Sequence, residues 1–305
     1  YLYLPCFSIQ ISGKQVKTDE KLSIFRKKKF VFEVRDLWPE LPKALGMRNP
    51  FWLWGMSALE WLSYHCADAC IGLSPGICVG IKKRSQINKP IAMIPNGCDL
   101  EIFKPSLRDN LLLEGVKPTD KVVIFTGAHG VANGLDAILD AAAVLKDMGR
   151  DDIVLVFVGD GKVKPHLMER ARKEQLDNCK FYAPMPKTEL NKLVASADVG
   201  LMVLANVPAF YYGTSPNKFF DYISSGLPVL NNYPGWLADM IKENHLGVVV
   251  TPNDAKAFAV GLISLLDNED YRVSCGKNAR CFAESHFSRA QLGNEFVSFL
   301  ESVVE

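Results

Sequence analysis

The fold is decided by the stretch KVVIFTGAHGVANGLDAILDAAAVLKDMGRDDIVLVFVGDG, residues 121–161. Residues 121–127 form a β-branched run that predicts a buried strand. Residues 134–149 have the apolar spacing of an amphipathic helix that ends at a glycine, and residues 151–161 predict a second strand. A strand, a helix and another buried strand in this order indicate a βαβ unit with parallel strands.

The same alternation continues toward the C-terminus. Further strands are predicted at 179–184, 199–204, 228–232 and 247–250, and helices at 163–175, 187–197, 216–226, 235–244 and 254–267. This alternation predicts a doubly wound α/β domain, in which ligands bind at the carboxyl ends of the strands. One rim of the sheet should therefore carry Gly127, Gly159–Gly161, Ala183–Pro184 and the loop before Pro216.

The region before this domain shows a shorter α/β alternation. Strands are predicted at 28–34, 68–72 and 90–94, with helices at 50–67 and 77–86 between them. These strands are too few for a full doubly wound domain, and residues 1–25 do not supply the missing ones. We therefore expect an incomplete N-terminal domain at 1–98, a second domain at 99–284, and a C-terminal helix at 285–305 that packs back toward the first domain.

Composition fits a protein of two globular domains and excludes some partners. The chain has 305 residues, 48% of them hydrophobic and 23% charged, and its formal net charge is +1. No global field draws such a chain to nucleic acid. No signal peptide or membrane-length apolar run is visible, which predicts a cytoplasmic protein. The run Arg26–Lys29 is interpreted as a solvated strand entry, with peripheral contact to an anionic membrane as the alternative.

The cysteines and the aromatic residues carry less information about function. Eight cysteines are scattered along the chain, and no second pair at zinc spacing accompanies Cys66 and Cys70. We interpret all eight as reduced core residues, and predict no metal site. The segment NPFWLWGMSALEWLSY, residues 49–64, is interrupted by Glu60 and small residues, and is predicted to be an amphipathic helix.

A glycine-rich turn, FTGAHGVANGLD at residues 125–136, joins the first strand of the second domain to its helix. Backbone N–H groups at such a turn, and the helix dipole, suit a phosphate group. The spacing is neither G-x-G-x-x-G nor a P-loop. It resembles the turn of short-chain dehydrogenases, but none of the nine tyrosines is followed four residues later by a lysine, which disfavours hydride transfer. Tight packing between strand and helix is the structural alternative.

A second charged turn lies in GTSPNKFFDYISSGLPVL, residues 213–230. Pro216 suits the first turn of a helix, and Lys218 in that turn opposes the helix dipole unless an anion binds there. Asp221 follows on the same face, where a carboxylate can accept both hydroxyl groups of a ribose. The alternative is an ordinary surface ion pair between the two side chains.

Together these motifs resemble a known family. VRDLWPE (34–40), ACIGLSPGI (69–77), IPNGCDLEIF (94–103) and residues 155–174, 179–204, 235–272 and 276–288 are similar to retaining GT-B glycosyltransferases of group 1, also called family 4. The nearest members are bacterial enzymes of polysaccharide and lipopolysaccharide biosynthesis with a D-L-W-P-E loop. The likeness runs from about Phe30 to the end. It implies two Rossmann-like, doubly wound domains that face each other across a cleft, the N-terminal one incomplete.

The resemblance also implies roles for individual residues. Of the family's two glutamates in this region, the second matches Asp221, the ribose ligand, and the first falls on Gly213. Arg35 stands where the family has a histidine, and Asp36 is the candidate positioning group on the acceptor side. Lys218 is the candidate catalytic cation. The residues expected to bind the donor are Gly127, His129, Asn133, Met185, Thr214, Ser215, Pro216, Asn217 and Asp221.

The activity implied by the resemblance is transfer of a hexose-type sugar, hexosyl or N-acetylhexosaminyl, from a UDP-sugar with retention at the anomeric carbon. The acceptor would be a glycan or a lipid-linked sugar, and no metal or other cofactor would be needed. Two alternatives remain open from the sequence. One is a UDP-sugar epimerase of the same architecture, and the other is a non-catalytic protein that binds nucleotide sugars.

Overall fold

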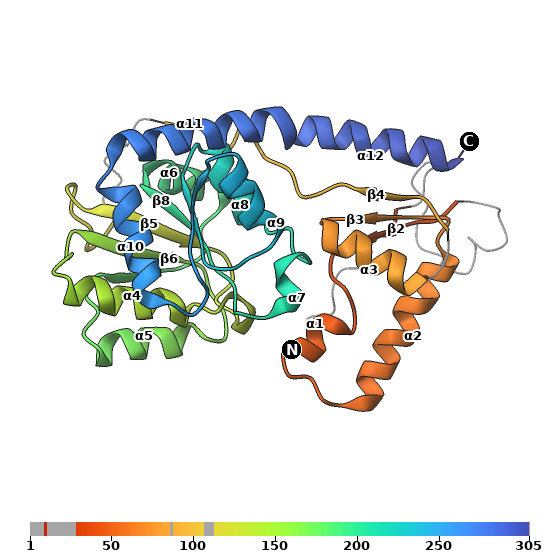
Figure 1. The fold of residues 1–305 in the computed structure, drawn as a ribbon, viewed down its shortest axis with the longest axis horizontal. Coiled ribbons are helices and arrows are strands. Elements are labelled where there is room, and N and C mark those ends of the chain that lie inside the picture. The colour runs from red at the N-terminus through yellow and green to blue at the C-terminus, as the bar shows by residue number, and fades with distance from the viewer. Residues whose placement is uncertain (1–8, 11–28, 86–87, 107–112, 305) are drawn as a thin grey trace. The chain divides into compact units, whose positions relative to one another are not determined.

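The structure, a computed structural model, describes residues 9–10, 29–85, 88–106 and 113–304 and consists of two compact units (Figure 1). The first unit contains the described residues up to Asn96, the segment Tyr212–Ser215, and residues 290–304. The second contains the described residues of Gly97–Tyr211 and the segment Pro216–Arg289. Cys6 and most of the basic run Arg26–Lys29 lie outside the described residues.

The second unit is built on a six-stranded parallel sheet with the order β10-β9-β8-β5-β6-β7. Its strands are β5 (Lys121–Thr126), β6 (Ile153–Val158), β7 (Cys179–Tyr182), β8 (Val199–Met202), β9 (Val229–Asn231) and β10 (Gly247–Val249). The chain starts in the middle of the sheet, builds outward to one edge and then returns to build the other edge. This order confirms the predicted doubly wound fold, and its topological switch point lies between β5 and β8.

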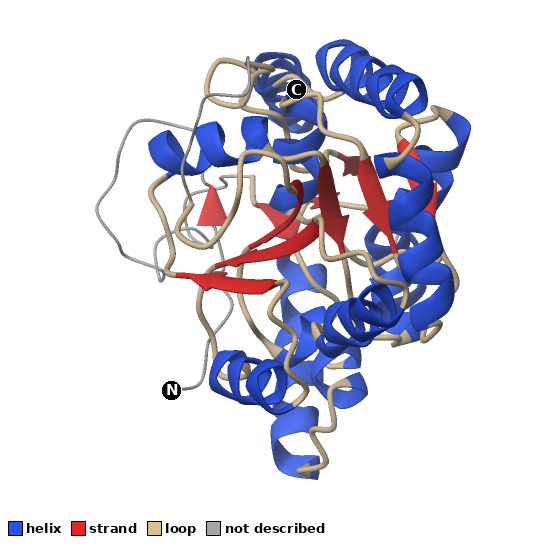
Figure 2. Ribbon diagram, turned by 90° about the vertical axis from the view of Figure 1, so that its left-hand side faces the viewer, coloured by secondary structure: helices blue, strands red, loops and turns tan. Residues whose placement is uncertain are grey.

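Helices cover both faces of this sheet (Figure 2). On one face α4 (Asp136–Asp147), α5 (Lys164–Lys173) and α10 (Ala255–Leu266) bury apolar residues against β5, β6 and β8. On the other face α8 (Asn217–Ser224) packs on β8 and β9, with α11 (Glu269–His286) against it. The remaining helices are the 3-10 turn η2 (Val131–Asn133), α6 (Lys187–Ser196), α7 (Pro208–Tyr211) and α9 (Trp236–Glu243).

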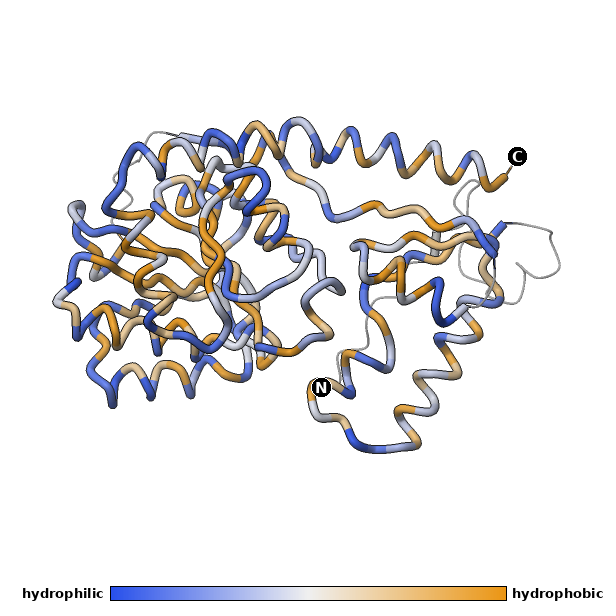
Figure 3. Tube along the Cα trace, in the orientation of Figure 1, coloured by the Kyte–Doolittle hydropathy of each residue, from blue (hydrophilic) through white to orange (hydrophobic). Residues whose placement is uncertain are grey.

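The core strands owe their position to their apolar runs. Every residue of β6 is buried, and five of the six residues of β5 are buried, so both faces of these strands are dry. Figure 3 shows these strands in the hydrophobic colours at the centre of the unit. Such two-sided burial is the reason the runs lack the polar alternation of a half-exposed strand.

The first unit has a smaller sheet with the order β1-β2-β3-β4. β2 (Val31–Val34), β3 (Ala69–Gly72) and β4 (Ile91–Met93) are parallel, and the two-residue β1 (Ile9–Gln10) pairs antiparallel with β2. The opening residues thus contribute a short strand that the sequence pattern did not predict. The helices of this unit are α1 (Glu40–Ala44), α2 (Pro50–Cys66), α3 (Pro75–Ser85) and most of α12 (Arg289–Val304).

Two sequence predictions are corrected by burial. Cys66 and Cys281 are exposed, because each lies on the outer side of a helix, so the prediction of a core position is wrong for these two. The other described cysteines are buried or half-buried thiols, and the described residues contain no cluster of three metal-ligating side chains. The segment at 49–64 does form a helix, α2, but its apolar side chains face outward, which is the reverse of the predicted amphipathic packing.

Among the described helices, none is both long enough and apolar enough to cross a bilayer.

Candidate functional site

Two glycine-containing loops meet at the carboxyl ends of β5 and β6. The loop after β5 and the loop after β6 exchange backbone hydrogen bonds, from the His129 amide to the Asp160 carbonyl at 2.8 Å and from the Val163 amide to the His129 carbonyl at 3.1 Å. A Cβ atom at Gly159 would lie 1.9 Å from the Gly127 oxygen, and one at Gly161 would lie 2.3 Å from the His129 oxygen. Only glycine allows this close approach, which fixes the shape of the rim.

The first turn of α8 brings a lysine to this rim. Pro216 precedes α8 as its N-cap, and the Lys218 ammonium donates a hydrogen bond of 2.8 Å to Asn133 Oδ1. The same nitrogen lies 4.0 Å from the ring centre of Phe125, a cation–π contact. Burial lowers the pKa of Lys218 to about 7, and no charged neighbour offsets that shift. A half-buried cation at a helix N-terminus is a poor arrangement in isolation, and an anion would relieve it.

α8 is held in this position by Tyr222. The Tyr222 hydroxyl oxygen accepts a hydrogen bond of 2.9 Å from the Thr126 amide at the end of β5, and it lies 3.1 Å from the Thr126 hydroxyl. Tyr222 is fully buried, and burial raises the pKa of its hydroxyl. Because Tyr222 lies one turn after Lys218, this contact sets the distance between the lysine and the glycine-rich turn.

His129 lies beneath the rim rather than on it. Its imidazole is fully buried beside Phe125 and Phe157, with ring centres 5.9 and 6.2 Å away, and neither ring nitrogen has a hydrogen-bond partner. Burial, with smaller effects from Lys164 and Lys218, lowers its pKa to about 4. The ring is therefore neutral at physiological pH, and the His129 backbone, not its side chain, shapes the turn.

Asp221 lies on α8 beside a second group of charges. Burial raises the pKa of Asp221 to about 6, while Lys187 and Arg289 oppose that rise and Asp99 adds to it. Asp99 is paired with the Lys187 ammonium at 3.2 Å and with the Arg289 guanidinium at 3.2 Å. The carboxylate of Asp221 thus faces a site with balanced charge, where it can accept hydrogen bonds from neutral hydroxyl groups.

The remaining predicted donor residues are placed as follows. Met185 is half-buried in the loop after β7, and Asn217 is exposed at the start of α8. Ser215 belongs to the first unit, where its hydroxyl accepts a hydrogen bond of 3.1 Å from the Asn96 amide. Thr214 belongs to the same unit and is half-buried. The structure therefore brings Gly127, Asn133 and Lys218 together, and places Asp221 one turn further along α8.

Sequence reasoning missed Tyr222, Asp99, Lys187 and Arg289. Tyr222 reads as an ordinary core aromatic residue, and nothing in its neighbours predicts its bond to Thr126. Asp99, Lys187 and Arg289 are far apart in the chain and meet only through the fold. Of these four residues, Lys187 could have been included from the sequence, because it directly follows the loop that contains Met185, a predicted donor contact.

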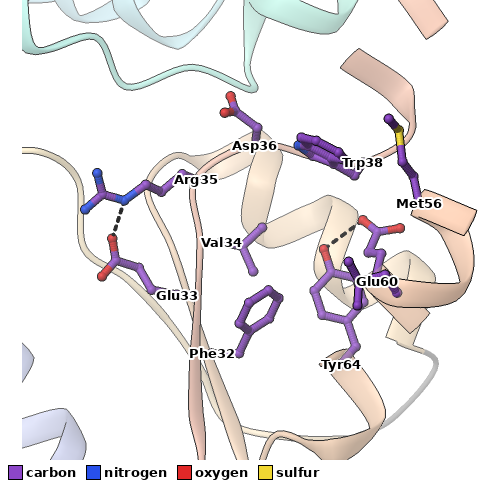
Figure 4. Close-up of a pocket in the computed structure, with 10 residues that line it drawn as sticks. Phe32, Glu33, Val34, Arg35, Asp36, Trp38, Met56, Glu60 and Tyr64 are labelled. Atoms are coloured by element: carbon purple, nitrogen blue, oxygen red, sulfur yellow. Dashed lines mark hydrogen bonds and ion pairs between the residues drawn. The ribbon is translucent and has the colours of Figure 1, made fainter. Parts of the chain in front are cut away.

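The first unit has its own cavity, of about 50 Å³, at the end of β2 (Figure 4). Its floor is apolar, and Glu60 and Tyr64 from α2 supply polar groups, with a hydrogen bond of 2.9 Å from the Tyr64 hydroxyl to Glu60. Arg84 pairs with Glu60, although burial still raises the pKa of that carboxyl. The residues that line the cavity are Phe32, Glu33, Val34, Arg35, Asp36, Trp38, Met56, Leu59, Glu60 and Tyr64.

The predicted acceptor-side residues lie at this cavity. Asp36 follows β2, and burial raises its pKa, with Arg35 opposing the rise. The Arg35 side chain is exposed and pairs with Glu33 at 2.9 Å. In Figure 4 the side chains of Glu33 and Arg35 lie on one side of β2, and those of Phe32 and Val34 lie on the other, as the alternation of a strand requires.

Comparisons with known sequences agree with these features. The family model described as Glycosyl transferases group 1 matches residues 113–282, more than half of the chain. D-inositol 3-phosphate glycosyltransferase of Corynebacterium glutamicum (strain R) is 27% identical over 207 residues, 62% of this chain and 46% of the relative. Probable glycosyltransferase WbjE of Pseudomonas aeruginosa is 24% identical over 237 residues, 76% of this chain and 58% of the relative. The chain spans about half the length of the curated relatives it matches.

Comparison with solved structures agrees at the level of the fold. The crystal structure of Alr3699/HepE from Anabaena, in complex with UDP and glucose, has a TM-score of 0.76 and 17% sequence identity. The match covers 92% of this chain and 73% of that chain. It confirms the GT-B type of α/β fold that the sequence predicted.

Proposed function

The chain belongs to the group 1 glycosyl transferases, and from this premise we propose that it transfers a hexose-type sugar from a UDP-sugar to a glycan or lipid-linked acceptor, with retention at the anomeric carbon. Hexosyl and N-acetylhexosaminyl donors both fit the proposal. The donor is bound by the second unit, and the acceptor by the first.

The observation that carries the proposal is the position of Lys218. Its ammonium lies at the switch point of a doubly wound sheet, beside a glycine-rich turn and at the N-terminus of α8. Switch points, turns of this kind and helix N-termini are each sites where phosphate groups bind. A diphosphate here would interact with Lys218, with the backbone N–H groups of Asn217 and Lys218 at the start of α8, and with Asn133.

Asp221 and Met185 provide for the nucleoside in this proposal. Asp221 lies one turn after Lys218, which matches the distance along a nucleotide from diphosphate to ribose. At neutral pH, above its pKa of about 6, Asp221 is ionised and accepts hydrogen bonds from both ribose hydroxyl groups. The backbone of the loop around Met185 then contacts the base, at the carboxyl end of β7.

In the proposed mechanism, the main catalytic effect is stabilisation of the leaving UDP by the protein. As the glycosidic bond to the phosphate breaks, negative charge builds on the UDP. Lys218, the backbone N–H groups and the positive end of α8 are already oriented to stabilise that charge. The acceptor oxygen forms the new bond to the anomeric carbon on the face from which UDP leaves, and the acceptor's proton passes to the departing phosphate. Attack on that face retains the configuration without a covalent nucleophile from the enzyme.

On the acceptor side we propose that Asp36 positions the reacting sugar. The raised pKa of its half-buried carboxyl makes it a strong hydrogen-bond acceptor for a sugar hydroxyl. The cavity beside it is lined by apolar side chains and by Trp38, Glu60 and Tyr64.

The test is incubation of the chain with UDP-sugars, with and without candidate acceptors. UDP release that depends on the acceptor, and a product with the donor's anomeric configuration by NMR, is the expected result. Interconversion of UDP-sugars without an acceptor would instead identify an epimerase. UDP binding without turnover of any donor would identify a non-catalytic binding protein.

A matched pair of variants tests the assigned residue. Lys218→Met should abolish acceptor-dependent UDP release and weaken UDP binding. Lys256→Met, at an exposed lysine of α10, changes the net charge equally and should leave both unchanged. If Lys218→Met keeps full turnover and UDP affinity, the diphosphate site is wrongly assigned.

A further inference from the structure

α2 of the first unit packs on its core with its polar side. Glu60 and Tyr64, four residues apart on one face, are the residues of α2 that are buried. Glu60 is held by Arg84 and by the Tyr64 hydroxyl. A helix in a water-soluble domain normally buries its apolar face and exposes its polar one. The burial of a glutamate here leaves the apolar side chains of α2 on the outside.

The outer face of α2 is apolar along its whole length. Phe51 is 83% exposed, Trp54 74%, Trp52 57% and Trp61 56%. Among the described residues, every exposed phenylalanine and tryptophan lies on this helix. The exposed residues of α2, which we call the outer face, are Pro50, Phe51, Trp52, Trp54, Ala58, Leu59, Trp61, Leu62 and Cys66. None of these residues is charged. Single exposed apolar residues are common on protein surfaces, but a contiguous set of them marks an interaction surface.

The exposed charged residues that precede α2 most closely in the chain, Lys43 and Arg48, are both cationic. Glu40, at the start of α1, is also exposed, and its carboxylate is paired with Arg84. Within α2 itself the one acidic residue is Glu60, which is buried in its pair with Arg84. An apolar surface bordered by cations complements an anionic lipid surface and repels no part of it.

We propose that the outer face of α2 binds the surface of an anionic bilayer. Tryptophan is the side chain most favoured at the boundary between lipid headgroups and acyl chains, and three of the chain's five tryptophans lie on this face. α2 lies in the plane of the interface with its aromatic rings inserted, while Lys43 and Arg48 contact the headgroups. Both the composition of the face and the charges beside it favour lipid over a protein partner.

This surface is adjacent to the cavity of the first unit. Leu59 lines the cavity and is also 46% exposed on the outer face, and Met56 and Glu60 line the cavity from the same helix. A molecule held in the cavity would therefore lie beside the lipid surface on which α2 rests. The inference requires only that α2 binds lipid, and holds whether or not the chain transfers a sugar.

The experiment is co-flotation of the full chain with vesicles, in the absence of any nucleotide sugar. We expect binding to vesicles that contain phosphatidylglycerol, weaker binding to pure phosphatidylcholine vesicles, and loss of binding at high salt. Brominated acyl chains should quench tryptophan fluorescence. Trp52→Ser/Trp54→Ser/Trp61→Ser should reduce the partition coefficient by about tenfold or more.

The matched control changes exposed apolar residues of the second unit, Val260→Ser/Val273→Ser/Met168→Ser, and should bind vesicles as the wild type does. Circular dichroism checks that both triple variants are folded. Failure of the wild-type chain to bind anionic vesicles would overturn the proposal, and so would unchanged binding by the tryptophan variant. A lipid-free dimer that the tryptophan variant alone loses would also overturn it, because the face would then be covered by a second copy.

Discussion

The protonation of Lys218 should depend on whether an anion is bound beside it. Burial lowers its pKa to about 7, so the free protein carries only part of this charge at neutral pH. A bound diphosphate favours the protonated form, and UDP binding must therefore take up a proton at and above pH 7. This dependence separates Lys218 from an ordinary surface lysine.

We expect the dissociation constant of UDP to rise between pH 7 and pH 9, by up to about tenfold per pH unit. In that window the diphosphate and Asp221, whose pKa is about 6, are already ionised, so Lys218 is the group that titrates. Isothermal calorimetry at four pH values measures the slope. Lys218→Met should bind weakly with no slope, and Lys256→Met should keep it; a flat wild-type profile would contradict the lowered pKa.

Asp221 can be tested by removing its partners on the ligand. Hydrogen bonds to a carboxylate contribute about 1.5–3 kcal/mol, so the wild type should bind UDP at least tenfold more tightly than 2′,3′-dideoxy-UDP. Asp221→Asn should bind the two ligands with similar affinity. Competition calorimetry completes this double-mutant cycle. An equal preference in wild type and variant would show that Asp221 does not contact the ribose.

His129 should make stability depend on pH. Its pKa is about 4 in the folded chain and about 6.5 when unfolded, so the unfolded chain binds more protons as the pH falls below 6.5. The contribution of His129 to the free energy of unfolding should therefore fall by on the order of 3 kcal/mol between pH 6.5 and pH 4 and then level off, whereas Asp221, with its pKa raised to about 6, changes stability in the opposite direction; the difference between wild type and variant isolates the His129 contribution. His129→Leu should lose that part of the acid sensitivity, which urea unfolding at each pH measures. Equal acid sensitivity in both proteins would exclude this explanation.

At the scale of the elements, the rim depends on two loops that touch backbone to backbone. Gly159→Ala would put a Cβ atom 1.9 Å from the Gly127 oxygen, which forces the turn after β5 away from Lys218. We expect UDP affinity to fall by more than tenfold and the melting temperature to fall by several degrees. Gly293→Ala, in α12 of the first unit, is the control, because no atom lies within 4 Å of its added Cβ. Unchanged UDP affinity in Gly159→Ala would show that the contact between the loops after β5 and β6 does not determine UDP binding.

The inner strands of the second unit, β5, β6, β8 and β9, could be predicted because their apolar runs are buried on both faces, whereas the edge strands β7 and β10 are mostly half-buried. The helices between them followed from their spacing, and Gly226, with φ +66°, ends α8 as the sequence indicated. The short α1 and α7 were not predicted, since a single turn has no periodicity to detect. The orientation of α2 could not be predicted either, because Arg84, which holds Glu60 in the core, comes from a different helix.

At the scale of the whole molecule, the sequence indicated which residues lie on the rim of the sheet, but not which charged residues surround Asp221. Lys218, Asn133 and Gly127 were expected on one rim, and the fold brings them together. The charges of Asp99, Lys187 and Arg289 near Asp221 come from three distant segments, and no local pattern announces them. His129 was expected as a polar contact, but its imidazole is buried because the apolar ends of β5 and β6 surround it.

The most direct measurement of the central claim is amide hydrogen exchange of the full chain with and without UDP. Binding at the proposed site predicts added protection in residues 127–134 and 216–225, and smaller changes near 183–187. Residues 255–266 of α10, on the opposite face of the sheet, should exchange at the same rate in both samples. Protection that spares the glycine-rich turn and the start of α8 would contradict the assignment of the nucleotide-sugar site.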